Sequence, residues 1–103
     1  MKKIIDHKVY NTETAELITS NDNGLSRSDF NVIEKNLYRT KRGQFFLHVF
    51  GGANTSYATK SNGFSSEGET IELINNEEAL EILIEWGEIE LVEKMFPGVI
   101  EEG

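Results

Sequence analysis

In the middle of the chain the apolar residues follow a period of two, over residues 30–40 and again over 44–50. This period is typical of β-strands, in which successive side chains point to opposite faces. Gly43 lies between the two segments and suits the left-handed conformation of a tight hairpin loop, so we expect antiparallel pairing. Both sides of the second strand are largely apolar, one with Phe45, Leu47 and Val49 and the other with Phe46, His48 and Phe50.

The N-terminal part of the chain has a less regular pattern. Apolar residues on both sides of the pair Asp6-His7 predict either a short hairpin or one bent edge strand. Asn11 suits an N-cap, and the acidic and apolar residues after it predict a short helix over residues 11–20. The polar segment 20–28 is then a linker within one domain, because it is too short to separate two domains.

The last part of the chain predicts a loop, a strand and two helical segments. Residues 51–69 are rich in Gly, Ser and Asn, and loops of this length in compact domains are usually functional or mobile. Residues 69–75 resume a strand. Asn75 and Glu78 then resemble a capping box at the start of a helix, which Gly87 ends or bends. The apolar positions expected to face inward in the two helical segments are Ala79, Leu80, Leu83, Ile84, Trp86, Ile89, Val92, Met95 and Phe96.

Together these elements predict one α+β domain over residues 1–103. We expect a small antiparallel meander of three or more strands, a short N-terminal helix, and acidic C-terminal helices packed on one face. If helices cover only one face, the side of the sheet with Phe46, His48 and Phe50 points away from the main core. We consider three ways in which this side of the sheet is covered: by the long loop folding back, by a second copy of the chain in a homodimer, or by a partner.

The composition fits a folded domain of this size. Its 103 residues are 38% hydrophobic, which is enough for one core without metal or disulfides. The absence of cysteine excludes disulfides, thiolate zinc sites and thiol catalysis. The first ten residues lack the apolar run of a signal peptide, and no run of eighteen apolar residues occurs. We therefore expect a cytoplasmic protein with no membrane partner.

Charge is distributed unevenly along the chain, whose net charge is −8. Five cations and two carboxylates give residues 24–43 a net charge of +3, whereas twelve glutamates and one lysine give residues 67–103 a net charge of −11. An acidic molecule repels phosphate at long range. A basic surface on another protein is therefore favoured as the partner over nucleic acid.

Basic residues gather around the predicted hairpin turn, beside an aromatic strand. Such a patch can meet phosphate or an acidic protein surface, with aromatic side chains supporting the cations. A solvated hairpin tip, whose charges discourage pairing of strand edges, explains the same residues without any partner. The first candidate partner surface consists of Lys35, Arg39, Lys41, Arg42, Phe46, His48 and Phe50.

Glutamates recur at helical spacing in the first predicted C-terminal helix and form the second candidate surface. Positions four apart rise by about 6 Å along a helix, comparable to the separation of backbone phosphates, so a row of carboxylates can imitate nucleic acid. Like charges four apart destabilise an isolated helix by about 0.2–0.5 kcal/mol per pair. A solvated acidic face is the alternative explanation. The residues of this row are Glu77, Glu81, Glu85 and Glu88.

Catalytic chemistry has little support in the sequence. The two histidines, His7 and His48, lie in separate predicted strands, and neither has the spacing of a metal motif. No serine is linked to either histidine by the pattern of a triad. We therefore expect no catalytic residue, no metal and no cofactor, and we expect a binding protein that is not an enzyme.

Four segments carry a resemblance to a known group of proteins: "YNTETAELI", "LYRTKRGQFFL", "GGANTSYA" and "EEALEILIEWGEIELVEKMFP". Together they resemble small proteins of phages and mobile elements of Gram-positive bacteria, which usually begin with a Tyr-Asp-Thr-Glu-Thr-Ala segment. Asn11 stands here in place of the Asp. Some members of this group are similar to anti-CRISPR inhibitors of the type II RNA-guided nuclease.

This resemblance implies an inhibitor that binds the nuclease and blocks guide RNA loading or target DNA binding. The acidic helix, the basic hairpin or both would make the contact. The alternative is a small phage-encoded module that regulates or binds nucleic acid directly through the basic hairpin. The resemblance implies no catalytic residues.

Overall fold

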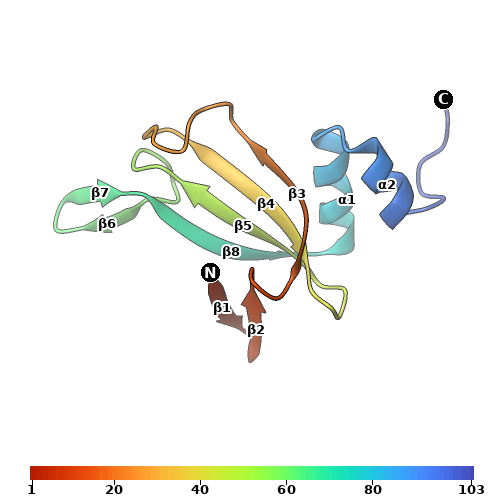
Figure 1. Ribbon diagram of the computed structural model, residues 1–103, viewed down its shortest axis with the longest axis horizontal. Coiled ribbons are helices and arrows are strands. Elements are labelled where there is room, and N and C mark those ends of the chain that lie inside the picture. Colours follow the sequence, from red (N-terminus) through yellow and green to blue (C-terminus); the bar gives the residue numbers. More distant parts are fainter.

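The computed structural model describes residues 1–103 as an α+β domain built on a four-stranded antiparallel sheet (Figure 1). The sheet has the order β3-β4-β5-β8, with strands β3 (Glu16–Asp22), β4 (Ile33–Arg39), β5 (Phe45–Gly51) and β8 (Gly68–Ile74). Two separate hairpins are formed by β1 (Lys2–Ile5) with β2 (Lys8–Asn11) and by β6 (Thr59–Ser61) with β7 (Phe64–Ser66). The helices α1 (Asn76–Glu85) and α2 (Ile89–Met95) follow β8.

The predicted pairing of the two central strands is confirmed. Leu37 of β4 lies opposite Leu47 of β5, and Tyr38 lies opposite Phe46. Gly43 has a φ of +88° in the turn that joins them, so it occupies the left-handed conformation expected of it. β8 pairs with the other edge of β5, which completes the meander.

One hydrophobic cluster joins the sheet to the helices. Leu37 of β4 and Leu83 of α1 are completely buried in it, and Ala79 lies one turn before Leu83 on the same side of α1. Burial of this apolar area is the main stabilising contribution from the helices. The buried members of the cluster are Leu37, Phe45, Leu47, Val49, Ile74, Ala79, Leu83 and Val92.

Two of the helical positions expected to face inward are exposed instead. Ile84 is 47% exposed and Ile89 is 70% exposed, while Ile82 packs against the core. Positions 79, 82, 83 and 86 form one helical stripe, and Ile84 falls beside it. Ile89 follows the left-handed Gly87, with a φ of +72°, which changes the direction of the chain before α2 begins.

The predicted helix over residues 11–20 is wrong. Asn11 does cap one turn, since its Oδ1 accepts a hydrogen bond from the Glu13 amide and its carbonyl accepts one from the Ala15 amide. After that turn the chain continues as β3, an edge strand paired with β4 through a bulge near Ile18. The pairing energy of the sheet therefore outweighs a local helical signal that extends over a single turn.

The N-terminal segment forms a short hairpin, β1–β2, and not one bent edge strand. Asp6 and His7 both have positive φ, at 50° and 64°, as a two-residue turn of type I′ requires. The same geometry recurs at Asn62 and Gly63, between β6 and β7. The segment 51–69 is therefore not one irregular loop, and Figure 1 shows its hairpin projecting from the end of the sheet opposite the helices.

A capping box begins α1, as the sequence predicts. The Asn75 side chain accepts a hydrogen bond from the Glu78 amide at 2.7 Å, and the Glu78 carboxylate accepts one from the Asn75 amide at 3.1 Å. These two bonds satisfy donors that have no partner within the helix.

Replacing Asn75 by Ala is expected to lower the free energy of unfolding by about 1 kcal/mol, because the cap bond is lost. Urea denaturation followed by circular dichroism measures this difference. Asn76→Ala is the matched control, since its side chain makes no hydrogen bond at the neighbouring position. Equal effects of the two substitutions would contradict a capping role for Asn75.

Candidate functional site

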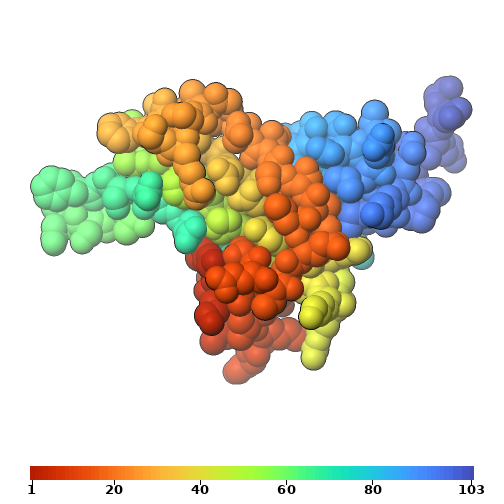
Figure 2. Space-filling model, in the orientation of Figure 1, coloured from red at the N-terminus to blue at the C-terminus, as the bar shows by residue number.

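An open basic cleft lies between the β1–β2 hairpin and the turn that joins β4 to β5. Its volume is about 900 Å³. Figure 2 shows the hairpin (red) and the turn (yellow) projecting from the same side of the molecule. Its lining includes Lys8 and His7 from the hairpin, Lys41 and Arg42 from the turn, and no aspartate or glutamate. We refer to these four residues with their surroundings as the basic cleft.

The turn of the basic cleft is held by its own backbone. The Thr40 amide donates to the Gln44 carbonyl, and the Gly43 amide donates to the Thr40 carbonyl, both at 2.9 Å. The Gln44 side chain in turn donates to the carbonyls of Phe45 and Ile74, which anchors the base of the turn to β5 and β8. Lys41 and Arg42 are therefore exposed at the tip of a fixed loop.

A second, smaller cleft of about 400 Å³ adjoins the first and shares Thr40, Lys41 and Gly43 with it. Arg39 lies in this second cleft, 3.8 Å from the Glu16 carboxylate and 5.8 Å above the Phe45 ring. The ion pair and the ring hold the guanidinium near the sheet. The cations of the turn thus continue along the end of β4.

The structure brings together only some of the basic residues proposed from the sequence. Arg39, Lys41 and Arg42 lie in the two clefts, whereas Lys35 lies beside Ile33 and Trp86 at another site. Sequence reasoning missed Lys8 and His7. The hairpin containing them was predicted, but nothing in the pattern indicates where that hairpin packs.

The other surface expected on this side of the sheet is largely covered within the monomer. Phe46 is completely buried, and its ring lies 5.2 Å from that of Tyr38 and 5.9 Å from that of Tyr10 in β2. Phe50 is 6% exposed, with the Arg27 guanidinium 4.1 Å above its ring. The expected outward aromatic surface is therefore wrong, because the β1–β2 hairpin and the segment with Arg27 cover it.

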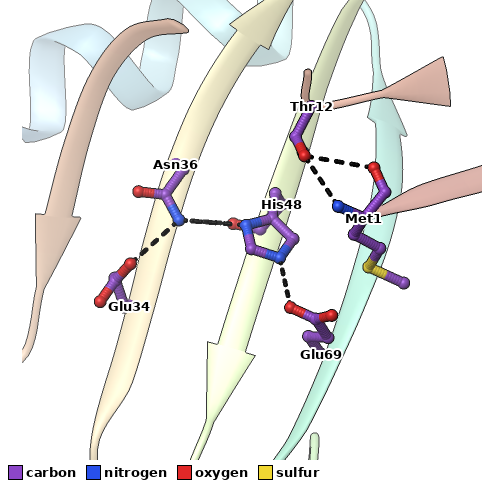
Figure 3. A network of polar contacts seen from close by, with 6 residues as sticks. All are labelled: Met1, Thr12, Glu34, Asn36, His48 and Glu69. Atoms are coloured by element: carbon purple, nitrogen blue, oxygen red, sulfur yellow. Dashed lines mark hydrogen bonds and ion pairs between the residues drawn. The ribbon is translucent and has the colours of Figure 1, made fainter. Parts of the chain in front are cut away.

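His48 takes part in a polar network on the same side of the sheet (Figure 3). Its Nε2 lies 2.8 Å from the Glu69 carboxylate, which accepts a hydrogen bond from it, and its Nδ1 accepts one from the Asn36 side-chain amide at 3.3 Å. Asn36 also donates to Glu34 and accepts from the Ser20 hydroxyl. The imidazole bridges β4 and β8, so its position between strands is explained without any partner.

Three glutamates of α1 have no intramolecular partner. Glu77, Glu81 and Glu85 are exposed, and none of their carboxylates forms a hydrogen bond or an ion pair. They recur every four residues, while Ala79 and Leu83 of the same helix are buried. We call these three glutamates the acidic row.

Glu88, the fourth glutamate of the predicted series, does not belong to the acidic row. It is half-buried, and its carboxylate accepts a hydrogen bond from the Thr19 hydroxyl at 3.2 Å. It also precedes α2 rather than continuing α1. Its role in the structure is to connect the helical segment to β3.

Comparison with known proteins gives no relative for this chain. It shows no significant similarity to any protein-family model, curated protein or solved structure. Neither of its helices is long and apolar enough to cross a membrane. No group of three or more His, Cys, Asp or Glu side chains is arranged to hold a metal ion.

Proposed function

We propose that this protein is a non-enzymatic inhibitor, encoded by a phage or mobile element, that acts in the cytoplasm of a bacterial host. It binds the type II CRISPR RNA-guided nuclease and blocks guide RNA loading or target DNA binding. The resemblance of its four sequence segments to phage proteins supports this proposal. The observation that carries it is the acidic row of α1.

The acidic row fits a partner with a basic surface. Glu77, Glu81 and Glu85 repeat at about 6 Å of rise, and no cation of the chain neutralises them. RNA-guided nucleases hold their nucleic acids in positively charged channels, recognising the backbone rather than its sequence. An exposed row of carboxylates competes for the same channel, and electrostatic attraction accelerates the encounter.

Removing the charges of the acidic row is expected to weaken inhibition. In the triple variant Glu77→Gln, Glu81→Gln and Glu85→Gln, the concentration needed for half-inhibition of target cleavage should rise about tenfold or more. Glutamine keeps the size and the helix propensity of the side chain, so the fold is preserved. Cleavage of labelled target DNA by nuclease and guide measures the effect.

The matched control removes three glutamates that lie elsewhere on the surface. The variant Glu13→Gln, Glu67→Gln and Glu102→Gln has the same net charge as the test variant, and all three positions are exposed. It should inhibit as well as the parent protein. Equal loss in both variants would assign the effect to net charge, and unchanged potency of the test variant would remove α1 from the contact.

The order of addition separates the two steps that the inhibitor is proposed to block. Protein added before the guide prevents guide loading, whereas protein added to the loaded nuclease prevents only target binding. Guide length is measured in the same samples. Shortened guide or target in the absence of nuclease would contradict a non-enzymatic mechanism.

A further inference from the structure

We infer that the basic cleft binds the phosphate backbone of a single nucleic-acid strand, without reading its sequence. This activity is separate from the proposed contact of α1. The cleft is bordered by the β1–β2 hairpin, which packs on Phe46, whereas α1 packs on Phe45 and Leu47. Since alternate residues of β5 point to opposite faces, the two surfaces lie on opposite faces of the sheet.

The charge of the cleft differs in sign from that of the whole protein. The chain has 18 carboxylates and only 10 lysines and arginines, yet three of those cations line the cleft and no carboxylate does. Two hairpins distant in sequence contribute them, Lys8 from one and Lys41 with Arg42 from the other. Cations that line one cleft repel one another, and an anion bound between them relieves that repulsion.

Two neutral polar side chains of the cleft also favour an anion. The Asn11 Oδ1 is already engaged by the Glu13 amide, which leaves the side-chain NH₂ of Asn11 to donate. The Thr40 Oγ1 accepts from the Gln44 amide, which leaves the Thr40 hydroxyl to donate. These two side chains therefore offer donors, while the Gln44 Oε1 and the Thr14 hydroxyl oxygen remain as acceptors, because the hydrogens of both groups are already donated.

The three cations of the lining, together with the Asn11 and Thr40 donors, favour a phosphodiester chain over an acidic peptide. Phosphate oxygens only accept hydrogen bonds, and arginine forms paired bonds to them. An extended acidic peptide would also bring its own backbone N–H groups, which need acceptors. In this cleft the side-chain oxygens of Asn11 and Thr40 are occupied, which leaves those of Gln44 and Thr14 as the side-chain acceptors.

The shape of the cleft indicates a strand and a mode of recognition. The cleft is open and continues into the neighbouring cleft, where Arg39 is paired with Glu16, so it suits an elongated ligand whose phosphates lie beside Lys8, Lys41 and Arg42 rather than beside that carboxylate. Tyr10 of the lining is 6% exposed and packs edge-on against Phe46, so its ring is not available for base stacking, and the exposed His7 imidazole is the one ring of the lining that a base can reach. Contacts to phosphates carry no sequence information and stacking on a single ring tolerates any base, so binding is independent of sequence.

Fluorescence anisotropy with a labelled 12-nucleotide oligouridylate, lacking a terminal phosphate, tests the inference without any nuclease. The parent protein should bind in low salt, and contact with about three phosphates gives a slope near −2 for log K against log salt concentration. The double variant Lys8→Gln with Arg42→Gln should bind about tenfold or more weakly, with a slope nearer −0.7.

The control is Lys35→Gln with Lys60→Gln, which removes two cations that lie outside the cleft. It should lose less than twofold in affinity. Thermal unfolding of each variant checks that the exposed substitutions leave the fold intact. Equal loss in the test and control variants would overturn the inference, because general charge would then explain the binding.

Competition identifies the ligand. Unlabelled oligouridylate and an oligodeoxynucleotide of the same length should displace the probe at similar concentrations, while inorganic phosphate should compete only weakly. Stronger displacement by poly-glutamate, or absence of binding at low salt, would refute a nucleic-acid site. Because no nuclease is present, either result leaves the proposed function of α1 untouched.

Discussion

Replacement of Phe46 by alanine is expected to lower the free energy of unfolding by about 3–5 kcal/mol. The Phe46 ring is completely buried between Tyr38, which stacks on it, and Tyr10, which meets it edge-on. Truncation removes the apolar burial and leaves a cavity in a close-packed site. Urea denaturation, followed through Trp86 fluorescence and circular dichroism, measures the loss.

Phe64 provides the matched control for this substitution. It lies in β7 and is 79% exposed, so Phe64→Ala should change the free energy of unfolding by no more than about 0.5 kcal/mol. A cost below about 1 kcal/mol at Phe46 would contradict the packing of the β1–β2 hairpin on the sheet.

Phe46→Ala is also expected to affect the basic cleft, because the core and the cleft share the β1–β2 hairpin. Tyr10 joins Phe46 in the core and also belongs to the strand that supplies Lys8. A folded fraction of Phe46→Ala should therefore bind the oligouridylate more weakly, although Phe46 does not line the cleft. The hairpin is held by few other contacts, and a two-stranded hairpin alone is marginally stable in water.

Local signals in the sequence predicted those elements whose geometry depends on near neighbours. The β4–β5 hairpin follows from alternation and Gly43, and the start of α1 follows from Asn75 and Glu78. The acidic row could be predicted for the same reason, since residues four apart lie on one side of any helix.

Where a local signal competes with pairing between strands distant in the sequence, the local pattern does not predict which of the two structures forms. Residues 11–20 contain a genuine one-turn cap at Asn11, yet β3 forms because β4 offers a partner strand. The hairpin β6–β7 was hidden in a polar Gly/Ser/Asn segment that lacks apolar alternation. Its Asn62-Gly63 pair is the turn signal that could have revealed it.

The basic cleft depends on a contact that no local pattern specifies. Lys8 and Arg42 line one cleft only because the β1–β2 hairpin lies on the sheet, and that position depends on packing between Tyr10 and Phe46. The sequence identifies both residues as apolar but not as partners. Conversely, the same packing removes Phe46 from the surface where the sequence had placed it.

Gly68→Ala is expected to lower the free energy of unfolding by about 3 kcal/mol or more. This is the upper end of the range for adding a methyl group to a close-packed site. Gly68 is buried at the start of β8, opposite Gly51 of β5. The segment between these strands crosses close above them, so a Cβ on Gly68 would overlap the carbonyl oxygen of Tyr57. A backbone oxygen cannot move aside as a side chain can, and the crossing itself must shift.

Gly63→Ala separates this steric cost from the conformational cost of replacing glycine. Gly63 has a φ of +80° in the β6–β7 turn and open space around it, so its substitution should cost about 1–2 kcal/mol through backbone strain alone. Gly68 has no positive φ, and its cost arises from the contact with Tyr57. Urea denaturation of both variants decides between the two causes. A smaller loss for Gly68→Ala than for Gly63→Ala would show that the segment above β5 and β8 is not held against them, and the base of the β6–β7 hairpin would then be free to rearrange.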